Sequence, residues 1–432
     1  MTARQAALDV LSNVLEKGSY LNLELKKVLR DGFSVEDRRF AAALTSTTIE
    51  NIGRIDYILD QFISAKRVHK VIKNILRLGV CQLLFFESVP ASAAVNESVK
   101  LAQSNGKKQL KGFVNGVLRN VAKGVGSIAY PQADDDFAYY LSVMYSYPRW
   151  LCEMYIADYG EEFTEQMLEY KGEPSLTCVR HNKIKSDDPP EGLGKGLYLS
   201  DAFYIKNATD IENMPAFVRG EITVQGEASM ITVLAADVGV DDHVLDVCAA
   251  PGGKSAYAAQ MACEGTVTAA DIHSHRVELI KKTAERLGAE NVEAMLQDAT
   301  QYRGDFEEKF DIVLADVPCS ALGLLNRKPD IKLHKRSDDI RSLVEIQREI
   351  LETSARYVKP GGTLLYSTCT INKRENQENV EWFLEHNKNF RLDELKNYIP
   401  AALMNRAEGG MMQLYPHIDR VDGFFMARLV KA

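Results

Sequence analysis

The chain has 432 residues, 46% of them hydrophobic and 26% charged, with a formal net charge of −8. This length predicts two or three globular domains, and the composition excludes a disordered or fibrous protein. Seven cysteines without a C-x-x-C pair argue against a disulfide framework or a zinc site. Because no window approaches the roughly eighteen continuous apolar residues of a membrane span, we expect a cytoplasmic protein with reduced thiols, no bound metal and no membrane partner.

Residues 1–125 are predicted to form an all-helical domain, because apolar residues recur at helical spacing over residues 7–15, 49–62 and 71–86. Pro90 ends the last of these helices, and Lys111 and Arg119 fall on the exposed side of a helix over residues 110–119. Residues 61–123 carry eleven Lys and Arg against two Glu, a net charge of +9 within an acidic chain. This region is either a solvated helical face or a surface that binds phosphate groups.

An acidic, turn-rich linker over residues 126–136 separates this domain from a small α+β module predicted over residues 137–220. In that module a helix is expected after Pro148, and residues 175–180 have the polar alternation and β-propensity of a strand. The module would bridge its neighbours or contact RNA.

Residues 221–432 follow a strand, glycine turn and helix pattern. Residues 242–248 are expected to form a buried strand, residues 249–255 a tight turn and residues 256–261 a helix. The glycines let the backbone approach a ligand, and the helix start offers unpaired N–H groups. The turn matches neither the dinucleotide nor the P-loop fingerprint.

Polar residues stand at the ends of the strands expected in this region. The strands end, in chain order, at Cys248, Asp271, Asp298 and Asp316, and a last strand over residues 362–368 is followed by Cys369. Because open α/β sheets bind ligands at the carboxyl ends of their strands, this series predicts a nucleoside pocket on a parallel sheet. Cys319 comes just after Pro318 breaks the fourth strand, so it and Cys369 either share one pocket or are two buried cysteines without chemistry.

Taken together, several stretches resemble the S-adenosylmethionine-dependent RNA cytosine-C5 methyltransferases. They are LDVCAAPGGKS at 245–255, DVPCS at 316–320, RKPDIK at 327–332, STCT at 367–370 with Glu375 and Asn376, and DGFFMARL at 422–429. The stretches ILRLGVCQLL at 75–84 and GFVNGVLR at 112–119 resemble the NusB-like RNA-binding domain of the small-subunit ribosomal RNA methyltransferase B branch. The resemblance covers nearly the whole chain. It implies an all-α NusB-like amino-terminal domain and a carboxyl-terminal α/β Rossmann-like methyltransferase domain over residues 221–432.

The resemblance also implies the reaction, which is methyl transfer to C5 of a cytosine in small-subunit ribosomal RNA. Cytosine C5 becomes nucleophilic only after a thiolate adds at C6, so covalent catalysis by a cysteine is expected. On spacing alone, either Cys319 or Cys369 can be that nucleophile. The resemblance assigns attack to Cys369 and product release to Cys319, and Asp316 would hydrogen-bond the pyrimidine edge.

Cofactor contacts are implied in the same way, and the positive charge of residues 61–123 predicts RNA contacts. S-adenosylmethionine would contact Cys248, Ala249, Ala250, Pro251, Gly252, Gly253, Lys254, Asp271, Asp298 and Asp316. RNA would contact basic residues of the helical domain and of the RKPDIK stretch, namely Lys66, Arg67, Lys107, Lys108, Lys111, Arg119, Arg327, Lys328 and Lys332. The expected substrate is a locally unpaired RNA rather than DNA, and the expected state is a monomer.

Two alternatives stay open at this point. One is the same chemistry on another RNA such as a transfer RNA. The other is an antitermination-type RNA-binding factor whose methyltransferase fold is not catalytic. A nicotinamide dehydrogenase is disfavoured, because the turn at 249–253 lacks the glycine spacing of a dinucleotide site.

Overall fold

The computed structural model describes residues 1–29, 32–172, 176–206, 208 and 210–432. The chain divides into two compact units, Met1–Tyr170 with Arg327–Lys335, and Lys171–Asn326 with Arg336–Ala432. The division after Tyr170 falls inside the segment predicted as one module over residues 137–220, so the helices over residues 137–169 belong to one unit and the strands to the other. Residue 175 of the strand expected there lies outside the described residues. The predicted boundaries at residues 125, 136 and 220 stay predictions.

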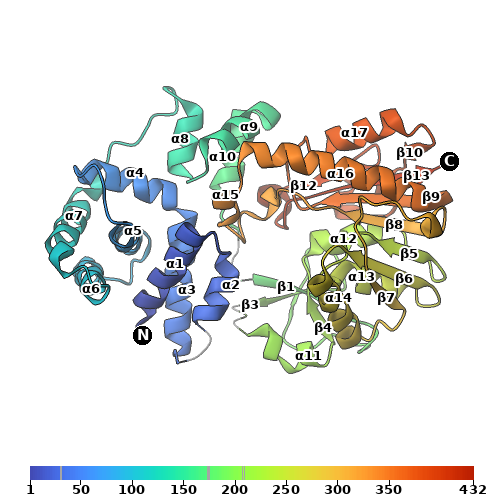
Figure 1. Cartoon of the computed structure of the whole chain (residues 1–432), viewed down its shortest axis with the longest axis horizontal. Coiled ribbons are helices and arrows are strands. Elements are labelled where there is room, and N and C mark those ends of the chain that lie inside the picture. The colour runs from blue at the N-terminus through green and yellow to red at the C-terminus, as the bar shows by residue number, and fades with distance from the viewer. Residues whose placement is uncertain (30–31, 173–175, 207, 209) are drawn as a thin grey trace. The chain divides into compact units, whose positions relative to one another are not determined.

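The first unit is helical, which confirms the prediction for the amino-terminal region (Figure 1). Its helices are α1 (Ala3–Lys17), α2 (Leu21–Val28), α3 (Val35–Glu50), α4 (Ile52–Phe62), α5 (Lys70–Phe85), α6 (Ala91–Ser104), α7 (Lys111–Gly124), α8 (Phe137–Met144), α9 (Arg149–Tyr159), α10 (Glu161–Glu169) and α15 (Ile331–His334). Helix α1 begins where the Thr2 hydroxyl accepts the Gln5 N–H at 3.2 Å. It ends at Gly18, whose φ of 68° is a conformation that side chains other than glycine's disfavour.

A short segment from the carboxyl-terminal half of the sequence belongs to this helical unit. Residues Arg327–Lys335, which include α15, are the RKPDIK stretch and its continuation. The buried carboxylate of Asp330 accepts the Leu21 N–H at 2.9 Å. The Lys332 ammonium donates to the carbonyl of Glu50 at 2.7 Å and lies 4.8 Å from the centre of the Tyr147 ring. These hydrogen bonds satisfy helix-end groups of α2 and α3 that would otherwise lack a partner.

The second unit contains two sheets. The smaller is antiparallel with the strand order β2-β3-β1-β4, formed by β1 (Leu176–His181), β2 (Gly194–Lys195), β3 (Ala202–Lys206) and β4 (Ile222–Val224). The larger has nine strands: β5 (His243–Asp246), β6 (Thr266–Asp271), β7 (Val292–Leu296), β8 (Phe310–Asp316), β9 (Val358–Thr368), β10 (Phe390–Leu392), β11 (Ala407–Glu408), β12 (Met411–Leu414) and β13 (Phe424–Lys431). The helices of this unit are α11 (Pro215–Val218), α12 (Glu227–Ala235), α13 (Gly253–Met261), α14 (Ser274–Leu287), α16 (Ser337–Tyr357), α17 (Gln377–His386) and α18 (Pro416–Asp419).

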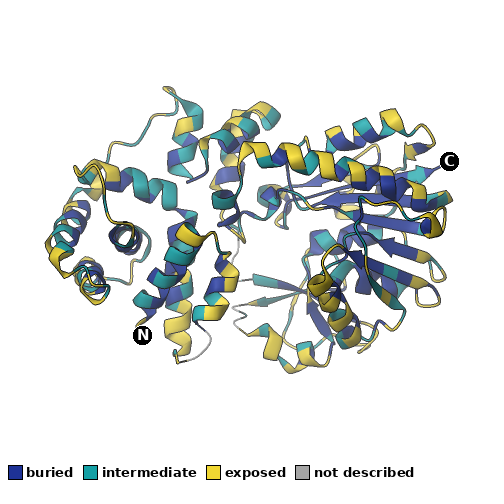
Figure 2. Ribbon diagram, in the orientation of Figure 1, coloured by how far each residue is buried: buried dark blue, intermediate teal, exposed yellow. Residues whose placement is uncertain are grey.

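The predicted parallel sheet is present as the larger part of the nine-stranded sheet. Its strands β7-β6-β5-β8-β9 are parallel, and β13, β12 and β11 extend the β9 edge with antiparallel pairing. The antiparallel extension was not anticipated from the sequence. Alternate side chains enter opposite cores, as Val244 and Leu245 do. Helices α12 and α13 cover one face and α16 and α17 the other, which leaves the strands buried and the outward helix faces exposed (Figure 2).

In the described part of the chain, no helix is long and apolar enough to cross a bilayer. The longest helix of the second unit, α16, instead alternates a buried stripe with charged residues, which is the pattern of a helix on a sheet surface.

Candidate active site

The strand order places a crevice at the carboxyl ends of the parallel strands of the larger sheet. From β5 the chain proceeds to β6 on one side, while β8 pairs with β5 on the other side. At such a reversal the loops that leave the carboxyl ends of the strands diverge, which opens a ligand site. The carboxyl ends of the strands carry Asp246, Asp271 and Asp316, and Cys369 follows the end of β9.

The turn between β5 and α13 has the form predicted from its glycines. Strand β5 ends at Asp246, two residues before the predicted end at Cys248, and α13 begins at Gly253. Gly252 has a φ of 100°, and a Cβ there would lie 3.3 Å from the backbone of Ile280. The positive φ favours a glycine here, a side chain would crowd Ile280, and the bare backbone leaves the N–H groups of the turn accessible.

Asp246 is a functional candidate that the sequence analysis missed. Its side chain is fully buried, and the Ser255 hydroxyl donates to its Oδ2 at 2.7 Å. Its Oδ1 has no hydrogen-bond partner among the described residues. Burial raises the pKa of Asp246 to about 6, against the lowering effect of the Ser255 hydrogen bond. The sequence did contain a signal for this residue, because Asp246 is acidic and lies two positions before Cys248. Had the strand been predicted to end at Asp246, this carboxylate would have joined the other polar residues at strand ends.

The carboxylate at the end of β6 and the one just after β7 each accept a hydrogen bond from a nearby backbone N–H. Asp271 is buried, accepts the His273 N–H at 3.0 Å and lies 3.5 Å from the Arg276 guanidinium. Asp298 is half-buried and accepts the N–H and the hydroxyl of Thr300 at 3.0 and 2.7 Å. Each carboxylate is therefore held in place at the crevice, with further acceptor capacity on its oxygens.

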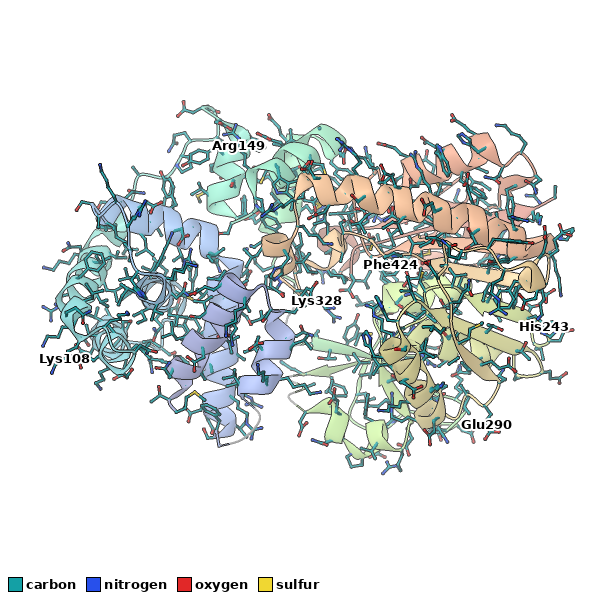
Figure 3. All side chains as sticks on the ribbon, in the orientation of Figure 1. Lys108, Arg149, His243, Glu290, Lys328 and Phe424 are labelled. Atoms are coloured by element: carbon teal, nitrogen blue, oxygen red, sulfur yellow. The ribbon has the colours of Figure 1, made fainter. Side chains whose placement is uncertain are left out.

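Lys254 and Asp316 form an ion pair within the crevice. The Lys254 ammonium lies 2.7 Å from Asp316 Oδ2, and the Ser367 hydroxyl donates to Asp316 Oδ1 at 2.8 Å. Burial disfavours the charged ammonium, but attraction to Asp316 and, to a smaller extent, to Asp246 and Cys369 together outweighs it, so the pKa of Lys254 is raised. The ammonium also lies 5.1 Å from the centre of the Phe424 ring, which Figure 3 labels.

The two cysteines lie side by side, as the shared-pocket interpretation expected. Strands β8 and β9 pair with Asp316 opposite Ser367, so the residues that follow each strand emerge together. The sulfur atoms of Cys319 and Cys369 are 3.2 Å apart, and both residues are half-buried. The hydrogen bond with Cys369, followed by burial, raises the pKa of the Cys319 thiol well above its ordinary value.

A buried carboxylate holds the loop that carries Cys319. Glu375 is fully buried, and its Oε1 accepts the Ser320 N–H at 2.8 Å and the Gln347 side-chain amide at 3.0 Å. Its Oε2 accepts the Ser320 hydroxyl and the Asn372 amide. The Gln347 amide also donates to the Pro318 carbonyl at 2.9 Å. Because a buried charge needs such donors, this network fixes the backbone on both sides of Cys319.

Most of the predicted RNA contacts are surface residues of the helical unit. Lys66, Arg67, Lys108, Lys111, Arg119, Arg327 and Lys328 are exposed, and Lys107 is half-buried. Figure 3 labels Lys108 at the outer edge of that unit. The structure disagrees with the prediction for Lys332, whose buried ammonium is used by the Glu50 carbonyl and is therefore not free for a phosphate.

The site fits a nucleoside cofactor with a cationic group. Three features support this. Asp246 has a buried carboxylate oxygen without a partner among the described residues, a glycine turn precedes α13, and a carboxylate ends the next strand. Among the described residues, no cluster of three or more His, Cys, Asp and Glu side chains is arranged to hold a metal ion. The fold and the site are those of a Rossmann-like S-adenosylmethionine-dependent methyltransferase.

Comparisons with known proteins identify the family. Residues 233–430 match the family model 16S rRNA methyltransferase RsmB/F, and residues 1–123 match the NusB family model. The chain is 37% identical to the probable ribosomal RNA small subunit methyltransferase B of Bacillus subtilis, over 100% of this chain and 99% of that protein. Identity to the protein of the same name from Synechocystis is 32%, over 100% of both chains. The chain therefore belongs to the ribosomal RNA small subunit methyltransferase B family.

Two solved structures share the fold. The protein PH0851 superposes with a TM-score of 0.81 at 26% identity, over 99% of both chains. NSun6 from Pyrococcus horikoshii, solved with the S-adenosylmethionine analogue SFG, superposes with a TM-score of 0.57 over 65% of this chain and 97% of its own. At 23% identity the second likeness supports the fold alone. The family and the fold confirm the expected S-adenosylmethionine-dependent ribosomal RNA methyltransferase.

Proposed function

We propose that this enzyme transfers the methyl group of S-adenosylmethionine to C5 of a cytosine in small-subunit ribosomal RNA through a covalent bond between Cys369 and C6. The observation that carries the proposal is the pair of thiols 3.2 Å apart beside the ion pair of Lys254 and Asp316. A methyltransferase that acts on an oxygen or an amino nitrogen has no use for a thiol nucleophile. Activating a pyrimidine carbon does require one.

In the first step the Cys369 thiolate adds to C6. A new S–C6 bond forms, and the electrons of the C5–C6 double bond become available at C5, which then takes the methyl group. Asp316 accepts hydrogen bonds from the amino group and, once N3 is protonated, from N3, which stabilises the ring during addition. The Lys254 ammonium lies beside Asp316 and holds that carboxylate in place through their ion pair.

In the second step the C5 proton leaves to Cys319 or to a water that Cys319 holds. The electrons of the C5–H bond restore the C5–C6 double bond, the S–C6 bond breaks, and Cys369 is recovered as a thiolate. We favour the water as the acceptor, because the raised pKa of Cys319 keeps its thiol protonated, so that it is both a poor nucleophile and unable to take a further proton itself.

S-adenosylmethionine supplies an electrophilic methyl group on a sulfonium. For its binding, the turn at residues 248–254 offers backbone N–H groups, and Asp271 and Asp298 offer acceptors for hydroxyl and amino groups. The unused Oδ1 of Asp246 is a natural acceptor for the ammonium of the methionine moiety. A cation beside Asp246 lowers its pKa, so cofactor binding near pH 6 should release a proton.

The RNA substrate must present an unpaired cytosine. In a paired A-form helix the C5 edge faces a groove too narrow for a protein loop, so the target is looped or flipped out. We place the enzyme in the cytoplasm with its ribosomal RNA and propose that it acts as a monomer. The relatives named as small-subunit methyltransferases favour ribosomal over transfer RNA.

The test compares Cys319→Ala and Cys369→Ala, each incubated with RNA and S-adenosylmethionine and resolved on a denaturing gel. Cys319→Ala should methylate once and remain attached to RNA, because the C5 proton cannot leave. Cys369→Ala should bind the cofactor but form neither adduct nor 5-methylcytosine. The opposite pattern would exchange the two roles, and no adduct with either variant would refute the covalent mechanism. An antitermination-type binder would show no 5-methylcytosine even with the unaltered protein.

A further inference from the structure

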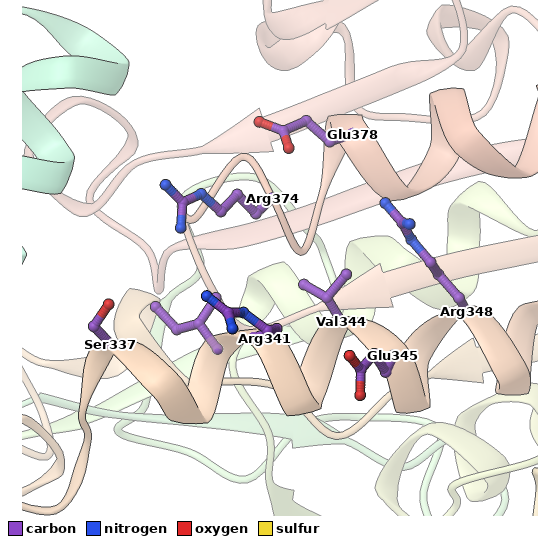
Figure 4. A pocket seen from close by; sticks show the side chains of 8 residues that line it. Ser337, Arg341, Val344, Glu345, Arg348, Arg374 and Glu378 are labelled. Carbon is purple, nitrogen blue, oxygen red and sulfur yellow. The ribbon is translucent and has the colours of Figure 1, made fainter.

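A hollow of about 300 Å³ lies on the second unit between α16 and the segment that leads into α17 (Figure 4). Its lining includes Arg341 and Arg348 from α16, Arg374 from that segment, and the carboxylates Glu345 and Glu378. Three guanidinium groups against two carboxylates leave the hollow with a net positive charge. None of these residues belongs to the cysteine and cofactor site described above.

Two of the three arginines are free to bind a ligand. Arg341 and Arg374 are exposed, and within the described part of the chain their guanidinium groups make no hydrogen bond or ion pair. Figure 4 shows both groups extending toward the side of the hollow where Ser337 lies. Arg348 differs, because its Nε donates to Asn379 at 2.9 Å and its guanidinium lies 4.7 Å from the centre of the Trp382 ring.

Residues next to the hollow in the sequence hold the loop that carries Cys319, and the hollow is also close in sequence to Cys369. Arg374 directly precedes Glu375, whose carboxylate holds Ser320, the residue after Cys319. Gln347 directly precedes Arg348, and its amide donates to the carbonyl of Pro318, the residue before Cys319. Arg374 follows Cys369 by five positions in the sequence, so their Cα atoms lie within about 18 Å of each other. A ligand in the hollow would therefore contact residues that adjoin the supports of the Cys319 loop.

We propose that the Arg341–Arg374 hollow binds a backbone phosphate of the substrate RNA strand a few nucleotides from the target cytosine. The inference rests on the proposed function for its choice of ligand. Guanidinium forks match phosphate oxygens bidentately, and every nucleotide beside the target carries such a phosphate. Phosphate contacts set register and orientation, which a base-flipping site requires. Glu345 and Glu378 oppose the phosphate, so they limit the affinity of the hollow.

The experiment measures binding of a short fluorescein-labelled single-stranded RNA by anisotropy as a function of salt. Arg341→Ala with Arg374→Ala should weaken RNA binding about 5-fold at 0.1 M salt and reduce the slope of log K against log salt by about 0.7, the values for one lost phosphate contact on a single strand. Affinity for S-adenosylmethionine should not change. Glu345→Gln with Glu378→Gln should tighten RNA binding.

The matched control is Lys281→Ala with Lys282→Ala, which removes two charges from the exposed face of α14. RNA affinity and salt slope should stay near the parent values in this control. Equal losses in both double variants, or unchanged binding in the arginine variant, would overturn the inference. Because anisotropy needs no catalysis, 5-methylcytosine formation by the parent protein is scored separately. A parent that binds RNA through the arginines but makes no 5-methylcytosine would refute the proposed function alone.

Discussion

Replacing Glu375 by Gln tests whether the buried network holds the catalytic loop. The carboxylate accepts hydrogen bonds from the Ser320 N–H and hydroxyl and from the side-chain amides of Gln347 and Asn372. A Gln amide keeps one acceptor oxygen and turns an NH₂ group toward the remaining donors. At least two charge-assisted hydrogen bonds are lost, each contributing about 1.5 kcal/mol or more, so unfolding of the second unit should become easier by about 3 kcal/mol.

For a unit of this size a loss of about 3 kcal/mol lowers Tm by about 6–12 °C, which differential scanning calorimetry resolves. Single-turnover methylation should slow by about 10- to 100-fold, because a displaced loop misplaces Cys319 relative to Cys369. Affinity for S-adenosylmethionine should stay near the parent value, since neither Asp246 nor Asp271 contacts Glu375.

Glu381→Gln is the matched control, because Glu381 is an exposed carboxylate on α17, close in sequence to Glu375. It should leave both Tm and methylation rate unchanged. A Glu375→Gln protein that melts within about 1 °C of the parent would refute the reasoning, because the four donors would then be satisfied without the carboxylate. A variant that melts lower but methylates at the parent rate would separate the stability of the network from any role in positioning Cys319.

Three further predictions concern the cofactor, the buried acid and the RNA surface. Asp271→Ala should weaken S-adenosylmethionine binding by about 1.5–3 kcal/mol, roughly 10- to 150-fold in Kd, and unchanged affinity by calorimetry would remove Asp271 from the site. Because the folded-state pKa of Asp246 is raised from 3.8 to about 6, its contribution to stability is fully present below pH 3.8 and is lost as the pH rises through 6. The Tm of Asp246→Asn relative to the parent should therefore increase from pH 5 to pH 8, and a constant difference would contradict the raised pKa. Charge reversal at Lys107, Lys108 and Lys111 should weaken RNA binding and flatten its salt dependence without changing cofactor affinity, and an unaltered salt slope would assign these lysines to a solvated face.

Local patterns in the sequence predict the parts of the molecule that depend on neighbours along the chain. Helical spacing places Lys111 and Arg119 on the exposed side of their helix, as the structure confirms. The positive φ of Gly252 is a local property of the turn at 249–255, and it favours glycine wherever the strand is placed in a sheet. One local detail failed, because β5 ends at Asp246 and the buried acid was passed over in favour of Cys248. Both residues follow the same apolar run, and propensity does not resolve a boundary of two residues.

Long-range contacts follow no local pattern. Whether Cys319 and Cys369 meet depends on β8 and β9 being neighbours, parallel and paired with Asp316 opposite Ser367, since a shift of one residue turns side chains to the other face. Lys332 carries the charge of an RNA-binding residue, yet its ammonium is buried against the Glu50 carbonyl because its segment folds with the helical unit. Hydrophobic period and turn chemistry are properties of adjacent residues, so they reveal strands, helices and the chemical groups at their ends. Strand order, register and the burial of a single charge arise from contacts between segments far apart in the chain, and these exist only once the chain has folded.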